Sequence, residues 1–375
     1  MLKGIYLSLM VGPAVPVIAP KEVMDDLTSI SVKESKESSG FQLVFNIGKN
    51  SLIQKALLPA GYFDPIVTRV ILIATVKGIP HVLMDGLVTN HELGPSSEAG
   101  KSTLTITGED LSLAMDLVSK TVPFPGMPEV AIINLLLAPY AALGIIPLVI
   151  PPIISTVKMP NEGFISQIST TDRSFIRSMA RSCGYVFFVQ PGPLPAQSIA
   201  YFGPDVSLPI PQPALTFNMD AETNVESLSF SLDGLAKAIR VFTILDPFTM
   251  KVPVPVPIPN VNVFKPPLGL KPPIPAKIEF DAEGSQLSPS EAAKAILGFM
   301  MNNPAAVSCS GSLNVTRYGT LLKSRMVVGV RGSGITYDGL YYVDSVTHSI
   351  KHGEYKQNFT LSRDGLISNT PFIRP

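Results

Sequence analysis

The chain has 375 residues and a formal net charge of zero, because 29 Lys and Arg balance 29 Asp and Glu. Only 15% of the residues are charged, against a usual ~25%, and 36 are proline. This length suggests two or three domains with a sizeable core. The neutral charge argues against a general nucleic-acid binder. A surface poor in charge favours a subunit that makes large contacts with other chains.

The first residues place one base, Lys3, before an apolar run that ends near Val11, which superficially resembles a signal peptide. Gly12 and several prolines interrupt the run, and no small-residue cleavage site follows cleanly. We therefore expect a first β-strand. Beyond it, apolar stretches between turn residues predict strands at 27–34, 41–47, 67–76, 80–84, 86–91 and 102–107. This spacing indicates a small antiparallel barrel or sandwich.

Capping residues and helical periodicity together predict three helices. The first, 109–118, has acidic residues in its first turn. The second, 172–183, places apolar residues and arginines on opposite faces and ends at Gly184. The third follows the capping box Ser288–Glu291 and ends before Pro304.

Residues 130–157 form the longest uncharged stretch, and their number would be enough to cross a bilayer. Four prolines divide the stretch, and each removes a backbone donor that lipid cannot replace. We expect instead a short buried helix over 129–143, a stop at Gly144 and a strand over 145–150.

A proline-rich segment splits a second β-rich region. Strands are predicted at 227–232 and 240–245, and again between 306 and 361, where 341–350 and 355–361 form a hairpin. From Val252 to Pro259 prolines alternate with apolar residues, and Pro-Pro pairs follow up to Pro273. Such a backbone is extended and has few donors, which excludes a central strand and a helix. We expect a rigid arm lying on a neighbour, with a flexible spacer as the alternative.

The residues able to carry catalysis form no recognisable set. Cys183 and Cys309 lack CxxC spacing, and we expect both to be small buried apolar residues. The four histidines are His81, His91, His348 and His352. His91 begins a zincin-like motif that lacks its second His. His348 and His352 are four residues apart, but the second falls in the predicted hairpin turn, which argues against a metal pair.

The remaining motifs also have simpler structural interpretations. Residues 329–334 are glycine-rich but have neither a dinucleotide fingerprint nor the lysine of a phosphate loop, so we expect a turn between strands. Asn314 and Asn358 begin glycosylation-type triplets inside predicted strands. The pairs Asp25–Asp26 and Glu109–Asp110 are interpreted as solvated turns and helix-start charges. We predict no catalytic, cofactor-binding or metal-binding residue.

Three segments, in order, resemble a known family. They are 81–88 followed by 102–118, then 169–177 through 183–189, and finally 339–350 followed by 353–361 and 363–365. The family is that of baseplate hub proteins. The first segment resembles the end of their first barrel, the second resembles their recurrent helix-Gly-strand unit, and the third resembles their closing hairpin. These hubs belong to contractile phage tails and contractile injection systems. The proline-rich insert between Val252 and Pro275 matches nothing in this pattern.

The resemblance implies a mainly β chain with helical insertions (α+β), with two tail-tube-like antiparallel β-barrels and a small α/β middle region. We expect the first barrel in 1–108, a helical connector and the small α/β domain in 109–213, and the second barrel in 214–250 and 305–375. The proline-rich arm and its helix, 251–304, would be inserted in the second barrel.

The resemblance further implies a non-enzymatic structural hub similar to late-control and VgrG proteins. Three copies with two barrels each would form a homotrimer that joins a sixfold inner tube to a threefold spike. No spike segment follows the closing hairpin, so we expect the spike to be a separate polypeptide. The expected partners are the chain itself, the spike protein, the inner tube protein and other baseplate components, without nucleic acid, a cofactor or a membrane span. Assembly is expected in the bacterial cytoplasm, and the product would be part of a phage tail or contractile injection particle.

Two other functions remain open on the sequence. One is a hydrolase with an unrecognised site, and the other is a membrane-anchored or secreted β-rich protein, with residues 130–157 as the anchor. The sequence does not distinguish a phage tail from an extracellular or membrane-anchored injection system.

Overall fold

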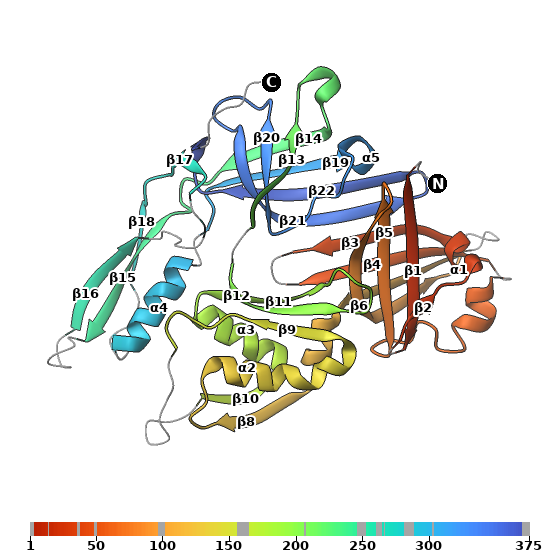
Figure 1. Ribbon diagram of the computed structural model, residues 1–375, viewed down its shortest axis with the longest axis horizontal. Helices are drawn as coiled ribbons and strands as arrows, with labels where there is room; N and C mark the ends of the chain where they lie inside the picture. The colour runs from red at the N-terminus through yellow and green to blue at the C-terminus, as the bar shows by residue number, and fades with distance from the viewer. Residues whose placement is uncertain are drawn as a thin grey trace.

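The computed structural model describes residues 4–13, 15–35, 38–48, 51–96, 102–155, 165–205, 208–245, 253–259, 265, 267–280, 289–301 and 304–369. The chain is mainly β with helices inserted between strands, as expected (Figure 1). Within these ranges the largest element is a 13-stranded sheet, and four smaller sheets accompany it.

The N-terminal part of the large sheet contains the strands predicted before residue 110 and one short strand at 17–18 that was not predicted. They are β1 (Ile5–Pro13), β2 (Val17–Ile18), β3 (Leu27–Glu34), β4 (Ser39–Ile47), β5 (Thr68–Val76), β6 (Ile79–Gly94) and β7 (Ser102–Asp110). Their order is β3-β4-β7-β6-β5-β1-β2, with every neighbouring pair antiparallel. The first strand is thus confirmed. The separately predicted strands 80–84 and 86–91 are one strand, because the Asp85 carboxylate is paired with Arg69 and does not end the strand.

The C-terminal part of the same sheet contains β13 (Leu208–Thr216), β14 (Val225–Leu232), β19 (Val307–Asn314), β20 (Met326–Arg331), β21 (Gly339–Lys351) and β22 (Glu354–Arg363). The predicted β21–β22 hairpin is confirmed. β21 also pairs with β3, so the two β-rich regions form one sheet. Among the described strands the main path runs from β14 to β2 and does not return on itself. Two closed barrels therefore remain a prediction.

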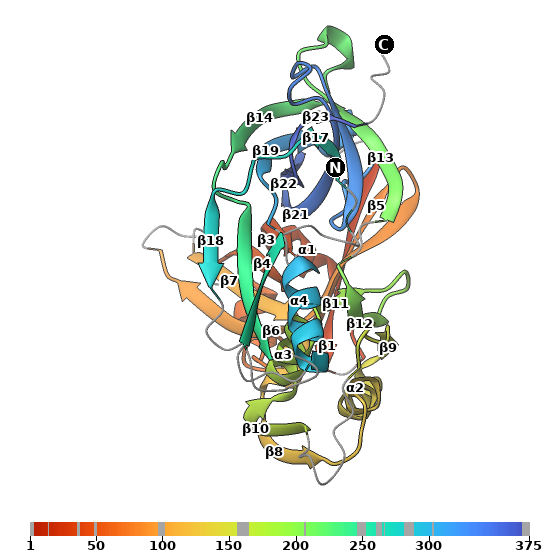
Figure 2. The same ribbon diagram turned by 90° about the vertical axis from the view of Figure 1, so that its left-hand side faces the viewer.

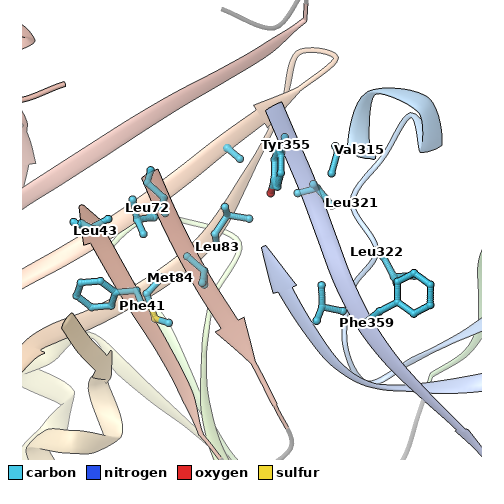
Figure 3. Close-up of a cluster of buried hydrophobic side chains, with 14 of the residues drawn as sticks. Phe41, Leu43, Leu72, Leu83, Met84, Val315, Leu321, Leu322, Tyr355 and Phe359 are labelled. Carbon is cyan, nitrogen blue, oxygen red and sulfur yellow. The ribbon is translucent and has the colours of Figure 1, made fainter. Parts of the chain in front are cut away.

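One hydrophobic cluster continues across both parts of the sheet. Phe41, Leu43 and Leu72 from the first part belong to the same buried cluster as Leu322 and Phe359 from the second. Figure 3 shows these side chains on either side of the junction. A shared core of this kind makes the relative position of the two parts depend on packing as well as on the β3–β21 hydrogen bonds.

The middle region has its own core and contains the stretch that was long enough to span a bilayer. α2 (Glu129–Leu137) continues as a 3-10 helix, Ala138–Leu143, which stops at Gly144 with φ +77°. β9 (Ile145–Val149) follows and pairs in parallel with β12 (Ser198–Pro204), itself antiparallel to β11 (Tyr185–Pro191). The predicted helix, stop and strand are confirmed. No helix in the described ranges combines the length and apolar character needed to cross a membrane.

The other helices of the middle region agree in part with prediction. α3 (Asp172–Ser182) begins at the cap Thr171, and Gly184 follows it with φ +71°, as expected. The helix predicted over 109–118 is shorter and of another type, a 3-10 helix over Leu111–Asp116. The difference arises because Asp110 ends β7 and caps the 3-10 helix by accepting a hydrogen bond from Ser112 N. β8 (Ser119–Phe124) and β10 (Ile165–Thr171) form a two-stranded sheet beside these helices.

The proline-rich segment forms a strand within a small sheet. β15 (Ala238–Leu245) pairs with β16 (Pro253–Pro259) on one side and with β18 (Lys277–Phe280) on the other. β16 lies at the edge of this sheet. Every second residue of β16 is a proline without an N–H group, and the N–H groups of the residues between the prolines can donate to β15. β15 thus lies outside the 13-stranded sheet, although the range 214–250 was expected to belong to the second barrel. α4 (Pro289–Met301) confirms the third predicted helix, whose cap Ser288 lies outside the described residues.

Candidate functional site

The four histidines considered for catalysis are spread over β6, β21 and the β21–β22 turn. His81 and His91 are on β6, His352 is in the β21–β22 turn as predicted, and His348 is buried within β21. Within the residues that the structure describes, no group of three or more His, Cys, Asp or Glu side chains is arranged to hold a metal ion. The geometry therefore assembles none of the four histidines into a common site.

His348 is part of a buried polar cluster where β3 and β21 pair. Its Nδ1 lies 2.7 Å from the Tyr355 hydroxyl, and its Nε2 lies 3.7 Å from Glu34 Oε1. Burial raises the pKa of Glu34, but His348, the Ser324 hydroxyl and Arg325 together outweigh burial and hold this pKa below its usual value. The cluster joins the two parts of the large sheet, which is a structural role.

Both cysteines are buried and unbridged, as predicted. Burial raises the pKa of both thiols, and that of Cys309 to about 12. A thiol with a raised pKa is a poor nucleophile at neutral pH.

The other motifs have structural positions. The predicted turn at 329–334 is confirmed only in part, because residues 329–331 are the end of β20 and only 332–334 lie in the connection to β21. Asn314 and Asn358 lie in strands, as predicted. Asp110 differs from the expected solvated charge, because its buried carboxylate accepts hydrogen bonds from Ser39 N at 2.8 Å and Ser112 N at 2.9 Å. Burial raises the pKa of Asp110 despite these bonds.

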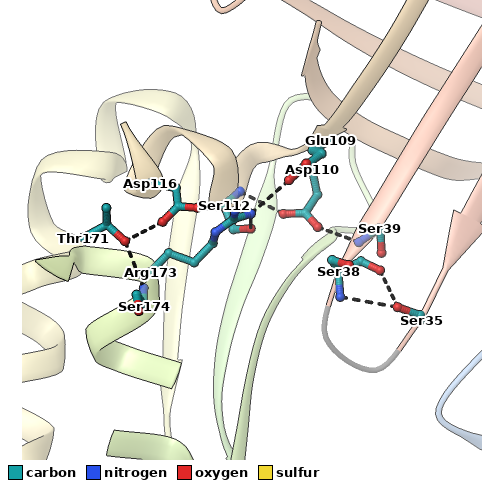
Figure 4. Close-up of polar contacts among 10 residues, drawn as sticks. All are labelled: Ser35, Ser38, Ser39, Glu109, Asp110, Ser112, Asp116, Thr171, Arg173 and Ser174. Carbon is teal, nitrogen blue, oxygen red and sulfur yellow. Dashed lines mark hydrogen bonds and ion pairs between the residues drawn. The ribbon is translucent and has the colours of Figure 1, made fainter. Parts of the chain in front are cut away.

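An ion-pair cluster connects the first β-rich part to the middle region (Figure 4). Arg173, in the first turn of α3, donates to Glu109 at 3.0 Å and also to Asp116. Thr171, which caps α3, donates to the same Asp116. The arginine face of α3 was expected from its periodicity, and the structure shows that this arginine holds the helix against the end of β7.

Two further arginines connect regions that are far apart in sequence. Arg69 and Asp85 form a buried pair with two contacts of 2.7 Å, and Ser198 from β12 donates to the same carboxylate at 3.0 Å. Arg325 donates to Ser35 O at 2.6 Å and stacks over Phe188 of β11. The sequence reasoning missed these residues, since a single charged residue within an apolar stretch does not indicate its partner.

The strongest signs of partner contact are exposed apolar side chains. On β9, Ile145 and Val149 pack in the middle core, whereas Ile146 and Leu148 are 49% and 50% exposed. Their register neighbours on β12, Ile199 and Tyr201, lie on the same outer face. Exposed apolar side chains grouped on one sheet face are typical of contact surfaces. These exposed surfaces are therefore the candidate functional site.

Comparisons with known proteins identify the fold. No known protein family and no curated protein sequence matches this chain. The crystal structure of the tail protein from Neisseria meningitidis MC58 matches with a TM-score of 0.63 and 15% identity, over 97% of this chain and 98% of that one. The 43 kDa tail protein of prophage MuSo2 from Shewanella oneidensis gives a TM-score of 0.64 and 13% identity, over 96% and 99% of the two chains.

A third match comes from a secretion system. The E. coli protein is a component of the type VI secretion system with structural similarity to the T4 bacteriophage tail proteins gp27 and gp5. It matches with a TM-score of 0.52 and 10% identity, over 93% of this chain and 78% of that one. The structural resemblance expected from the three sequence segments is thus confirmed, and the chain has, over nearly its whole length, the fold of phage tail proteins and a type VI secretion component.

Proposed function

We propose that this chain is a structural hub at the centre of a contractile baseplate, where a homotrimer joins a sixfold inner tube to a threefold spike. The observation that carries the proposal is the fold match to phage tail proteins, which covers 97% of this chain and 98% of the Neisseria protein. The match therefore includes the middle region and both β-rich parts, and is not limited to one common motif.

The arrangement of strands supports the symmetry-matching mechanism. Each β-rich part supplies one unit, antiparallel throughout in the first part and antiparallel apart from the parallel β13–β20 pair in the second. We propose that both units curve into tube-like barrels in the assembled trimer. Three chains with two units each would then offer six similar surfaces to the tube, while the trimer keeps threefold symmetry for the spike. The continuous β3–β21 ladder and the shared core would hold the two units of one chain at a fixed angle.

The chemistry of the described residues supports a role without catalysis. The buried charged groups are engaged with structural partners, as in the Arg69–Asp85 pair and the Arg173 cluster. Such contacts give rigidity to an adaptor that transmits position between other subunits. We propose that the partners are the spike, the inner tube and other baseplate proteins, and that assembly occurs in the bacterial cytoplasm.

The test is to tag the chain in its native host, purify it gently, and measure both its mass and the proteins that accompany it. Three chains of 40.1 kDa give a trimer of 120.3 kDa. We expect this mass together with tube, spike or sheath subunits. A strict monomer that binds neither tube nor spike protein would contradict the proposal.

A further inference from the structure

In the small sheet formed by β15, β16 and β18, the charged side chains lie on the face that a helix covers. The side chains of Arg240 and Phe242 face α4, where the Arg240 guanidinium lies 4.6 Å from the Phe299 ring centroid. Glu279 joins the same face through its 2.9 Å ion pair with Arg240. A sheet covered by a helix on one face normally places its charges on the other, solvated face. Here the charges lie on the helix-covered face.

The opposite face of this sheet is apolar and open. Paired residues on neighbouring strands point to the same face, and the register aligns Ile278 with Ile239 and Phe280 with Val241. Pro257 of β16 aligns with Val241 on the other side. Ile278 is 61% exposed and Phe280 is 79% exposed. We call this surface, Ile239, Val241, Pro257, Ile278 and Phe280, the arm face.

The β9 side of the middle sheet presents a second open apolar face. It consists of Ile146, Leu148, Ile150, Ile199 and Tyr201, which we call the β9 face. None of the ten residues that make up the two faces is charged, although Arg325 covers Phe188 on the β11 side of the same sheet face. Each face therefore matches a partner surface that is itself apolar.

The two faces cannot meet within one chain. α4 covers the inner side of the arm sheet and packs against α3, which in turn packs against β11 of the middle sheet (Figures 1 and 2). Lys294 of α4 is also held 2.7 Å from Glu129 of α2. The helical layer therefore lies between the two open faces and keeps them apart. A second copy of the chain carries the missing counterpart for each.

We propose that the arm face of one chain packs on the β9 face of a second copy. The contact is heterologous, because it joins two different surfaces, and such contacts close into rings when the rotation per subunit is suitable. The inference rests on the self-association in the proposed function and assigns it to two named faces. The prolines of β16 leave the edge of the arm sheet without donors for further strand pairing, so we place the contact on the face of this sheet and not at its edge.

The first experiment compares the mass of the wild-type chain with that of Phe280→Asp by sedimentation velocity over a range of concentrations. A charge within an apolar contact, at the most exposed large hydrophobic residue of the arm face, is expected to weaken association by about tenfold or more. Ile335→Asp, at a site that is 76% exposed and outside both faces, is the matched control and should associate like the wild type. Circular dichroism checks that each variant is folded.

The second experiment places a photoreactive phenylalanine analogue at position 280 and identifies the cross-linked peptide by mass spectrometry. We expect a band of two chains, 80.2 kDa from twice 40.1 kDa, with the link in residues 146–150. A wild-type trimer that is unchanged by Phe280→Asp, or that cross-links elsewhere, would overturn this contact and leave the hub proposal standing. A wild-type monomer at every concentration would overturn both.

Discussion

The guanidinium carbon of Arg325 lies 3.6 Å from the centroid of the Phe188 ring. The same guanidinium donates to Ser35 O at 2.6 Å and contacts Gln190 Oε1 at 3.5 Å. One side chain from the C-terminal β-rich part thus contacts the N-terminal part and the middle region together. Arg325 therefore helps to fix the relative position of these three regions.

Replacing Arg325 by Ala should lower the free energy of unfolding by about 2–3 kcal/mol, because it removes a stacked cation and a charged hydrogen-bond donor. The free energy of unfolding of Arg325→Lys should lie between those of the wild type and Arg325→Ala, since an ammonium group keeps the charge but does not stack as a planar guanidinium does. Denaturant unfolding measures the differences, with the exposed Arg317→Ala as the control. An Arg325→Ala midpoint equal to that of the control would contradict this role.

Removing one charged side chain of the buried Arg69–Asp85 pair should lower the free energy of unfolding by about 3–5 kcal/mol, because the remaining charge stays buried without its partner. Arg69→Met alone should therefore be more destabilising than Arg69→Met combined with Asp85→Leu, which removes both charges. Thermal unfolding of the wild type, the two single variants and the double variant completes the cycle. Additive losses would show that the two side chains do not interact.

The contact between Glu129 and Lys294 predicts a pH dependence. Burial raises the pKa of Glu129, but hydrogen bonds from Lys294 at 2.7 Å and Ser155 at 2.5 Å outweigh it, so the pKa is lower in the folded chain than in the unfolded one. A lowered pKa contributes stability above the unfolded value of 4.5, and this stability is lost as pH falls through the folded value.

The check is the difference in melting temperature between the wild type and Glu129→Gln from pH 7 to pH 3. We expect the wild type to be more stable at pH 7 and the difference to shrink below pH of about 4.5. A difference that is constant over this range, or that grows on acidification, would exclude the lowered pKa.

Gly184 tests how closely α4 packs against the end of α3. It has φ +71°, and an added Cβ would lie 2.7 Å from Met301 Cβ and 2.9 Å from Gly298 Cα. Gly78 has a similar φ of +83° but open space around it. Gly78→Ala should therefore lower the free energy of unfolding by only about 1–2 kcal/mol, the cost of a left-handed backbone at a residue with a Cβ. Gly184→Ala should cost more and should increase hydrogen exchange in α4. Equal costs would contradict close packing of α4.

The local structure of this chain follows largely from its sequence. The helix, stop and strand across 129–150 were predictable because Gly144 favours a left-handed backbone and the prolines exclude a continuous helix. The cap and apolar face of α3 were likewise predictable, since both depend on residues within one or two turns. Asp85 misled the prediction, because an isolated carboxylate in an apolar stretch resembles the end of a strand until its partner is known.

Only the tertiary structure decided which of these elements meet. The β3–β21 pairing joins residues about 300 positions apart, and no local preference of either strand specifies the other, because the hydrogen bonds come from backbone groups that every residue carries. The same holds for Arg325 on Phe188 and for the open face of the arm sheet. Sequence alone determined the type of most segments through short-range sterics and periodicity, whereas long-range packing decided which apolar faces became core and which stayed open for a partner.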